Sequence, residues 1–267
     1  MKFELDRYLS RIKISKPKPS VEGLAQIQGA QLNAIAFENV DAFLSSIPDL
    51  EPSALIEKIL DKGRGGYCFE LNGLLGLALQ ALGFDFEPIL ARVRMGRSEG
   101  GPRHHLAYLV KAGGESWLVD AGFGGPAPLQ PLRLVNDQEQ QQEHETFRIR
   151  HESDSGDRVV EKRLNGDWFS LYSFDRAAVR RCDLDAANRL CATWSESLLA
   201  QNLLLCRYTD FGRIQLFNNS FSEFRADDQI SRLIETIDEL SALIRDNFGI
   251  TVSDSELSGI ANRLGLA

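Results

Sequence analysis

The segment from Cys68 to Leu82 is apolar on nearly every side, and it limits the folds open to this chain more than any other feature. Its large apolar residues share no single stripe; they are Leu71, Leu74, Leu75, Leu77, Leu79 and Leu82. A helix of this kind has to be covered by other elements all round. It stops at Gly83, the residue type that most often closes a helix. We therefore predict a buried, central helix over residues 68–82.

Helical periodicity also dominates the residues before this segment, up to about residue 84. Apolar residues three and four positions apart indicate two helices on either side of a proline-containing break at residues 17–20. They are Leu5, Tyr8, Leu9 and Ile12 for the first helix, and Leu24, Ile27 and Ile35 for the second. A third helix is expected from Pro52 to Gly63. This part of the chain therefore predicts a helical bundle.

From Phe84 onward the pattern changes to short β-rich runs separated by turn residues. Gly113-Gly114 separates two such runs. Asn165-Gly166 separates two more, and Asn-Gly is the preferred pair for a type I′ hairpin turn. These signals predict a compact antiparallel barrel or sheet. Residues 136–157 are acidic and contain three consecutive glutamines, so we expect a solvated loop beside a strand near Phe147 and Ile149.

The last part of the chain mixes strand and helix patterns. A hairpin is expected around Phe211-Gly212, followed by a helix from about Asp227. The apolar stripe of that helix would be Ile230, Leu233, Ile234, Ile237 and Ile244. Ser253 and Glu256 have the spacing of a capping box and predict a final short helix.

Composition excludes several classes of protein. The net charge is -8, which argues against nucleic acid or an anionic membrane as the main partner. No apolar run approaches the roughly 20 residues of a membrane helix. Glu4 and Asp6 interrupt the stretch where a signal peptide would be apolar, so we expect a cytoplasmic protein. The four cysteines lack CxxC spacing, which indicates neither a zinc site nor a disulfide framework.

Cys68 has the position of a reactive thiol. The segment Arg64-Gly-Gly-Tyr-Cys-Phe-Glu70 brings it through a glycine turn to the first turn of the buried helix. Unpaired N–H groups and the positive end of the helix dipole favour the thiolate there. A buried structural cysteine has the same sequence signature, because free cysteine is among the most often buried residue types.

A thiol nucleophile needs a base, and His105 is the candidate. Alternation along the strand that begins there places His105 on one face and His104 on the other. Asp120 follows the facing strand, within reach of His105 across the Gly113-Gly114 hairpin, and would orient the imidazole. A surface histidine and a turn aspartate would show the same pattern. His144 and His151 fall in or beside the acidic loop and are expected to be solvated.

Several motifs in order resemble the arylamine N-acetyltransferases, and the resemblance spans essentially the whole chain. The motifs are Phe37-Glu-Asn39, RGGYCFELN at 64–72, the His105 strand, DAGFGG at 120–125, WFSLYSF at 168–174 and FGI at 248–250. The resemblance implies a catalytic triad of Cys68, His105 and Asp120. It also implies acetyl-CoA as co-substrate, no metal, and a two-step transfer of the acetyl group through Cys68 to an arylamine or hydrazine.

The same resemblance implies the wider fold and site. The fold class would be α+β, with a helical domain carrying the nucleophile at 1–84, a β-barrel domain carrying the histidine and aspartate at 85–190, and an α/β lid domain at 191–267. Phe37 and Phe123 match the wall of the substrate pocket. Gly122, Gly124 and Gly125 match a turn beside coenzyme A, and Arg64 and Glu38 match an ion pair that braces the nucleophile turn. The protein would be a monomer or homodimer.

Other interpretations stay open at this point. A cysteine acyl-hydrolase or an amide synthase would use the same triad with a different acceptor or acyl donor. Four arginines lie close together in the sequence: Arg92, Arg94, Arg97 and Arg103. They are either ligands of the coenzyme A phosphates or a solvated edge of a hairpin.

Overall fold

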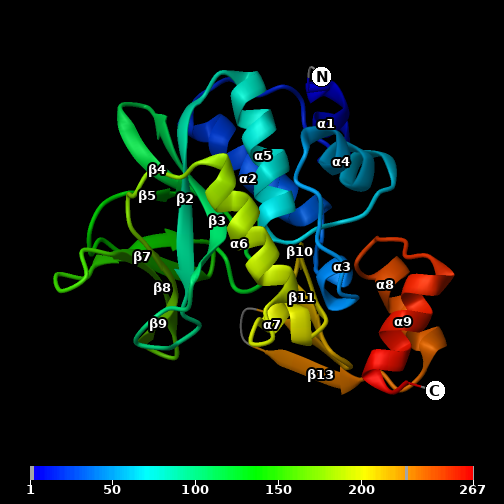
Figure 1. Ribbon diagram of the computed structural model, residues 1–267. Coiled ribbons are helices and arrows are strands. Elements are labelled where there is room, and N and C mark those ends of the chain that lie inside the picture. The colour runs from blue at the N-terminus through cyan, green and yellow to red at the C-terminus, as the bar shows by residue number, and fades with distance from the viewer. Residues whose placement is uncertain (1–2, 226–227, 267) are drawn as a thin grey trace.

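The protein is an α+β molecule, as expected, seen here in a computed structural model that describes residues 3–225 and 228–266. Helices from the N-terminal part pack against an eight-stranded antiparallel sheet that nearly closes into a barrel, while a five-stranded sheet and the remaining helices form the C-terminal part (Figure 1). One apolar core joins the N-terminal helices to the barrel, and a second lies under the C-terminal helices.

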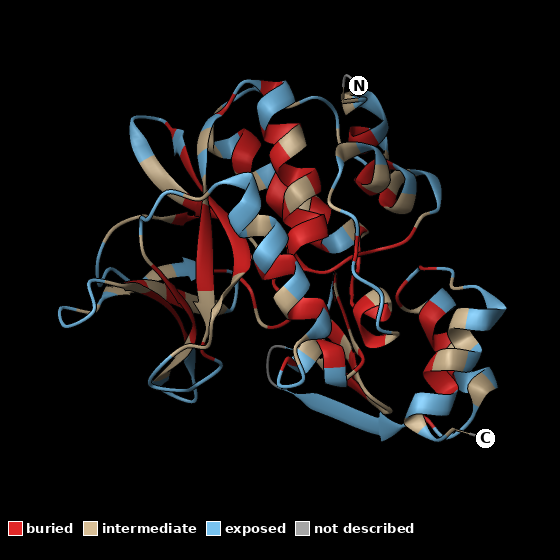
Figure 2. Ribbon diagram, viewed as in Figure 1, coloured by how far each residue is buried: buried red, intermediate tan, exposed pale blue. Residues whose placement is uncertain are grey.

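The N-terminal part is helical up to residue 82, and its last helix is central. Its helical elements are α1 (Leu5–Arg11), α2 (Val21–Ala34), α3 (Val40–Phe43), α4 (Pro52–Leu55), a π-helical turn η1 (Ile56–Asp61) and α5 (Cys68–Leu82). Helix α5 is buried on most of its circumference (Figure 2) and ends at Gly83, whose φ of 80° is left-handed. The prediction of a buried central helix is confirmed.

The barrel strands follow the expected hairpins. They are β2 (Asp85–Val93), β3 (Arg103–Ala112), β4 (Glu115–Val119), β5 (Leu132–Arg133), β6 (Gln140–Gln142), β7 (Glu145–His151), β8 (Arg158–Leu164) and β9 (Asp167–Phe174), in the spatial order β5-β4-β3-β2-β9-β8-β7-β6. Gly113-Gly114 joins β3 to β4. Asn165 and Gly166 join β8 to β9 with positive φ at both residues, as a type I′ turn requires.

The glutamine run is a strand and not the solvated loop that its composition suggests. Gln140 lies on β6, and its side-chain amide accepts from the backbone N–H of Arg133 and donates to the carbonyl oxygen of Arg133 on β5. Gln142 makes the same pair of bonds with the backbone of Gln130. Side-chain amides can therefore link the barrel edge at β5, and the residue Gln130 before it, to β6, because each amide has both an NH₂ donor group and a carbonyl acceptor.

The C-terminal part contains α6 (Arg181–Thr193), α7 (Leu198–Gln201), strands β10 (Leu204–Thr209), β11 (Gly212–Phe217), β12 (Ser220–Phe224) and β13 (Gln229–Leu233), and helices α8 (Ile237–Asp246) and α9 (Asp254–Leu264). The predicted hairpin around residues 211–212 joins β10 to β11, and the predicted capping box of Ser253 and Glu256 begins α9. Strand β1 (Phe37–Glu38) extends this sheet by pairing with β10.

The helix predicted from about Asp227 is wrong in its first half. Asp227 itself lies outside the described residues, and Ile230 and Leu233 belong to strand β13, an exposed edge strand that pairs with β12. The helix begins only after Thr236, whose side chain accepts a hydrogen bond from the backbone of Glu239. Ile and Leu at helical spacing fit an edge strand equally well when a neighbouring strand supplies backbone hydrogen bonds, as β12 does here.

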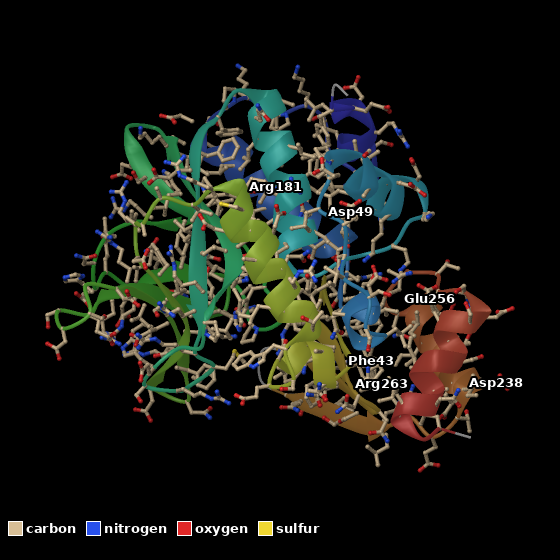
Figure 3. The ribbon with its side chains drawn as sticks, in the orientation of Figure 1. Phe43, Asp49, Arg181, Asp238, Glu256 and Arg263 are labelled. Atoms are coloured by element: carbon tan, nitrogen blue, oxygen red, sulfur yellow. The ribbon has the colours of Figure 1, made fainter. Side chains whose placement is uncertain are left out.

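Helix α9 is tied to the N-terminal part by side chains. The guanidinium of Arg263 lies over the ring of Phe43 on α3, with its central carbon 4.2 Å from the ring centroid, close enough for a cation–π contact (Figure 3). Glu256 bonds to Arg64 just before α5.

Helix α6 runs through residue 190, where we expected one domain to end. The division at residues 84 and 190 therefore stays a prediction.

Candidate active site

Cys68 occupies the first position of α5, as its sequence position predicts. Tyr67 is the N-cap, and its backbone N–H donates to the Glu70 side chain at 3.0 Å. The turn before it has no room for side chains, because a Cβ at Gly65 would lie 2.1 Å from the carbonyl oxygen of Ala36. The two glycines of this turn thus allow the backbone to pass close to β1 and deliver the thiol to the helix N-terminus.

A charged cluster lies under the nucleophile turn and is made of Glu38, Asp41, Lys58, Arg64, Glu70 and Glu256. The expected pair of Arg64 and Glu38 is present, with Nε 3.0 Å from Oε1, and Glu38 is completely buried. Arg64 also reaches Glu256 at 2.7 Å. Lys58 lies 2.7 Å from Glu70, and although Lys58 opposes the effect, burial raises the pKa of Glu70 to about 7.

His105 and Asp120 form a buried, hydrogen-bonded pair. Nε2 of His105 lies 2.7 Å from Oδ2 of Asp120, and each residue is 2% exposed. Burial alone would lower the pKa of His105, but the Asp120 carboxylate raises it to about 10. For Asp120 the two effects have the opposite signs: burial alone would raise its pKa, but the positive charge of His105 opposes burial, and the net shift of the pKa is downward. At neutral pH the pair can therefore hold a proton on the imidazole beside a carboxylate.

The Cys68 thiol lies next to this pair. Burial raises its pKa, while a hydrogen bond and the charge of His105 act in the opposite direction. The sulfur also donates to the carbonyl oxygen of His104 at 3.7 Å. The structure thus brings Cys68, His105 and Asp120 together; their catalytic roles remain predictions.

His104 sits on a β-bulge. Ala91 pairs with His105 and Arg92 pairs with Arg103, which leaves His104 without an opposing residue on β2. A bulge frees backbone groups from the ladder and re-aims side chains, and here it leaves the His104 carbonyl facing the thiol. Burial and then the charge of His105 lower the pKa of the His104 imidazole to about 4, so this ring stays neutral at physiological pH and does not compete as a base.

Asn72 is a site residue that the motif analysis did not single out. Its side chain donates to Oδ1 of Asp120 at 2.9 Å and to the carbonyl oxygen of Leu106, and it accepts from the N–H of Ala121. The signal was available, because Asn72 is a polar residue on a helix that is otherwise apolar all round. It lies four positions after Cys68 and thus on the same helix face.

Two further residues around Asp120 also escaped prediction. Gln28 on α2 accepts from the backbone N–H of Asp120. The ring of Tyr172 on β9 lies 5.0 Å from the His105 ring and 5.3 Å from the Phe123 ring, centroid to centroid. Both come from segments far from residues 68–120 in sequence, so no local pattern could place them at this site.

The glycine turn after Asp120 packs against the site itself. A Cβ at Gly122 would lie 2.6 Å from the Asn72 amide, and one at Gly124 would lie 2.7 Å from the Phe37 ring. Gly125 leaves more room, with Phe123 at 3.2 Å. Gly122 and Gly124 are therefore required by the packing of this protein's own residues, and the contact of the three glycines with coenzyme A stays a prediction.

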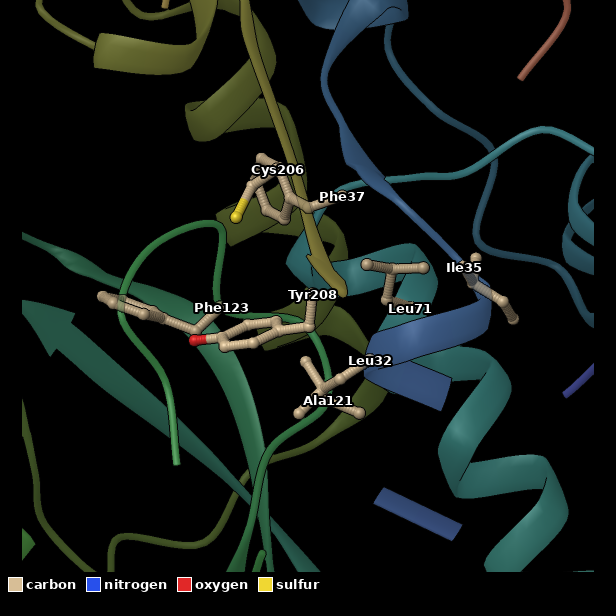
Figure 4. A pocket seen from close by; sticks show the side chains of 8 residues that line it. All are labelled: Leu32, Ile35, Phe37, Leu71, Ala121, Phe123, Cys206 and Tyr208. Carbon is tan, nitrogen blue, oxygen red and sulfur yellow. The ribbon is translucent and has the colours of Figure 1, made fainter. Parts of the chain in front are cut away.

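Phe37 and Phe123 line one cavity, together with Leu32, Ile35, Leu71, Ala121, Cys206 and Tyr208 (Figure 4). The cavity is about 10 Å³, room for one water molecule. Tyr208 fixes its outer wall, since its hydroxyl accepts from the N–H of Ala127 and donates toward the carbonyl oxygens of Gly125 and Ala127. An aromatic amine would enter this space only if the walls move apart.

Most arginines of the predicted cationic group are already engaged. Arg94 is buried and forms a two-pronged pair with Glu152, and Arg103 pairs with Asp175. Arg92 donates to the carbonyl oxygen of Gly101. These contacts favour a structural role on the barrel over the binding of coenzyme A phosphates.

The pair of Arg94 and Glu152 should stabilise the fold in a pH-dependent way. The hydrogen bond from Arg94 lowers the pKa of Glu152 to about 2. A carboxyl group whose pKa is lowered by folding stabilises the folded state at every pH above the ordinary pKa of glutamate. That stabilisation is lost as the pH falls through about 2, where the folded protein also binds the proton. Glu152→Gln should therefore lower the free energy of unfolding by about 1–2 kcal/mol at pH 7, after allowance for solvent screening, and by nothing near pH 2.

Urea unfolding of both proteins between pH 2 and pH 7 measures this effect. Glu139→Gln, which alters an exposed pair with Arg163, is the matched control and should show no pH-dependent difference. A constant difference at every pH for Glu152→Gln would contradict the assignment.

Within residues 3–225 and 228–266 no group of three or more histidine, cysteine, aspartate or glutamate side chains is placed to hold a metal ion. None of the helices in the same ranges is both long enough and apolar enough to cross a membrane.

A buried thiol at a helix N-terminus, beside a hydrogen-bonded imidazole and carboxylate, is typical of enzymes that pass an acyl group through a cysteine. Residues 20–257 match the sequence profile of the N-acetyltransferase family. The chain belongs to the arylamine N-acetyltransferases, acetyl-CoA-dependent enzymes that carry out acetyl transfer.

Individual relatives agree over nearly the full chain. The arylamine N-acetyltransferase / N-hydroxyarylamine O-acetyltransferase of Salmonella typhimurium is 35% identical over 88% of this chain and 84% of its own length. The arylamine N-acetyltransferase of Escherichia coli is 31% identical over 98% of this chain and 94% of its own.

Solved structures give the same result. The Salmonella typhimurium enzyme superposes with a TM-score of 0.91 at 32% identity, covering 98% of this chain and 97% of that one. The Mycobacterium marinum enzyme, solved in complex with CoA, superposes with a TM-score of 0.90 at 30% identity, covering 98% of each chain. The resemblance predicted from the motifs and the α+β fold class are confirmed.

Proposed function

We propose that this enzyme moves the acetyl group of acetyl-CoA to the nitrogen of an arylamine or arylhydrazine in two steps, through a thioester on Cys68. The observation that carries the proposal is the hydrogen bond of 2.7 Å between His105 and Asp120, directly beside a thiol at the start of α5. The names of the relatives support the arylamine class of acceptor.

In the first step Cys68 attacks the acetyl carbonyl carbon. His105 holds the proton that Cys68 gives up, as the raised pKa of its imidazole favours, and Asp120 stabilises this imidazolium. The N-terminus of α5 favours the thiolate and the oxyanion that forms in the tetrahedral intermediate, for which the backbone N–H of Cys68 is the proposed donor. His105 then returns its proton to the departing sulfur of coenzyme A.

In the second step the amine nitrogen attacks the thioester carbonyl. His105 accepts a proton from the nitrogen, the tetrahedral intermediate collapses, and the Cys68 thiolate leaves. We propose that Phe37 and Phe123 flank the aromatic ring of the acceptor, because both line the cavity beside the site. We also propose that the turn of Gly122, Gly124 and Gly125 borders the coenzyme A chain, since this turn adjoins Asp120 and Cys68.

The intact mass of the protein after incubation with acetyl-CoA, first without and then with an arylamine, tests the proposal. We expect one acetyl group on the Cys68 peptide, which disappears when the amine is added. Cys68→Ala should acquire none, whereas Cys182→Ala, which alters an exposed cysteine, should behave as the wild type.

Other outcomes separate the alternative functions. Release of free coenzyme A without amine acetylation would indicate an acyl-hydrolase. Labelling by an acyl carrier protein, and not by acetyl-CoA, would indicate an amide synthase. Acetylation of a residue other than Cys68 would overturn the proposed mechanism.

A further inference from the structure

A second buried thiol lies beside the nucleophile and has no part in the proposed reaction. Cys191 is on α6 and is 3% exposed. Its sulfur donates to the carbonyl oxygen of His104 at 3.3 Å, the same oxygen that Cys68 contacts at 3.7 Å. The two sulfur atoms therefore lie no more than about 7 Å apart. In a disulfide the Cβ atoms of the two cysteines lie within about 4.5 Å of each other, so the two side chains have to move closer before the bond can form.

The elements that carry the two thiols are also clamped together. The Tyr67 hydroxyl bonds to the Asn188 side chain, and the Asn188 amide donates to the carbonyl oxygen of Pro48. Tyr67 directly precedes Cys68. Asn188 lies three positions before Cys191 and therefore on the same face of α6. Formation of a disulfide requires rotation of the two cysteine side chains and a shift of α6, and this clamp keeps the two backbones close meanwhile.

We propose that Cys191 is a resolving thiol, which captures oxidised Cys68 in a disulfide and so keeps oxidation of the active site reversible. This inference uses the proposed function only for the reactivity of Cys68. The other two cysteines are placed differently, because Cys182 is exposed and Cys206 lines the cavity of Figure 4.

The chemistry needs a hydroperoxide as oxidant. The Cys68 thiolate attacks one peroxide oxygen, the O–O bond breaks, and Cys68 becomes a sulfenic acid while hydroxide leaves and is protonated to water. The Cys191 sulfur then attacks the Cys68 sulfur. An S–S bond forms, the S–O bond breaks, and the released hydroxide takes the Cys191 proton as a second water. Both thiols are oxidised and hydrogen peroxide is reduced to two waters.

The surroundings of the two sulfurs set the order of these events. Burial raises the pKa of Cys191 to about 12, and no other cause opposes it. Cys68 has the His105 hydrogen bond and charge beside it as well as the helix N-terminus. Cys68 is therefore the thiol that peroxide oxidises, and Cys191 reacts only with a sulfur that has already become electrophilic.

Hydrogen peroxide treatment of the wild type, Cys191→Ser and the matched control Cys182→Ser tests the inference. Remaining thiols are then blocked, and peptides are mapped without reduction. We expect a Cys68–Cys191 disulfide peptide in the wild type and in Cys182→Ser. In Cys191→Ser we expect Cys68 to carry two or three oxygens, and dithiothreitol to recover roughly tenfold less of the initial activity.

Three results would overturn the inference: oxygenated Cys68 in the wild type, a disulfide from Cys68 to Cys182 or Cys206, or equal recovery in the wild type and Cys191→Ser. Peptide mapping needs no acetyl transfer, so the inference and the proposed function can fail separately. If Cys68 carries the acetyl group, preincubation with acetyl-CoA should also block the disulfide; if acetylation occurs elsewhere, mapping of the disulfide still decides the role of Cys191.

Discussion

Asp120→Asn should lower kcat/KM for acetyl transfer by about 10³- to 10⁴-fold. The surroundings of Asp120 determine how asparagine would sit. Oδ1 accepts from the Asn72 amide and from the N–H of Gly122, both at 2.9 Å, so the oxygen of the new side chain has to occupy this position. Its NH₂ group would then face His105.

This orientation reverses the hydrogen bond to the imidazole. Nε2 of His105 would have to accept a hydrogen bond from the asparagine NH₂ group, which places the ring proton on the nitrogen that should take the Cys68 proton. The variant also removes the carboxylate that raises the pKa of His105 to about 10. Asparagine therefore keeps the shape of the aspartate side chain but stabilises the tautomer of His105 that cannot take the Cys68 proton.

Steady-state kinetics with acetyl-CoA and an arylamine, together with a thermal unfolding curve, measure the effect. Asp85→Asn removes an exposed pair with Lys111 and should keep wild-type kinetics. A loss of less than tenfold in a folded Asp120→Asn protein would rule out an orienting role for Asp120.

Arg64→Met should lower the free energy of unfolding by about 3–5 kcal/mol. Glu38 is completely buried, and Arg64 contacts it with Nε at 3.0 Å, so the variant leaves a carboxylate without its main partner in a dry site. Lys58 remains 3.7 Å from Glu38 and favours the lower end of this range. The link from Arg64 to Glu256 on α9 is lost as well.

Urea unfolding at pH 7 measures the change. The control is Arg181→Met, which alters exposed ion pairs on α6 (Figure 3) and should change stability by less than about 1 kcal/mol. Because Glu38→Gln removes the stranded charge, the double variant with Arg64→Met should be more stable than Arg64→Met alone. Equal stability of Arg64→Met and wild type would mean that the charged cluster adds nothing to the fold.

The predictable part of the site is the part with local signals. A glycine turn before an apolar helix places Cys68, and a strand, a hairpin and the facing strand bring His105 within hydrogen-bond distance of Asp120. Motif order then supplied the family. Asn72 had a local signal that went unused, whereas Gln28 and Tyr172 reach Asp120 and His105 only through tertiary packing.

The two errors in the fold have the same physical origin. Gln140 and Gln142 look like loop residues by composition, yet their side chains bond to the backbone of Arg133 on β5 and of Gln130 before it once the barrel is assembled. Ile230 and Leu233 have helical spacing, but β12 offers them a ladder that the local sequence does not show. In both places a contact with a neighbouring element decides the structure, and the pattern within the segment itself does not show that contact.

The bond between Arg64 and Glu256 has a consequence for biosynthesis. The two residues are 192 positions apart, so the turn that carries Cys68 leaves the ribosome early and receives its partner on α9 only after 192 further residues have been added. At about 5–20 residues per second, the nascent chain spends on the order of ten to forty seconds with Cys68 made and α9 still missing. During that interval Arg64 lacks Glu256, so the charged cluster under the nucleophile turn is completed only when α9 has been made.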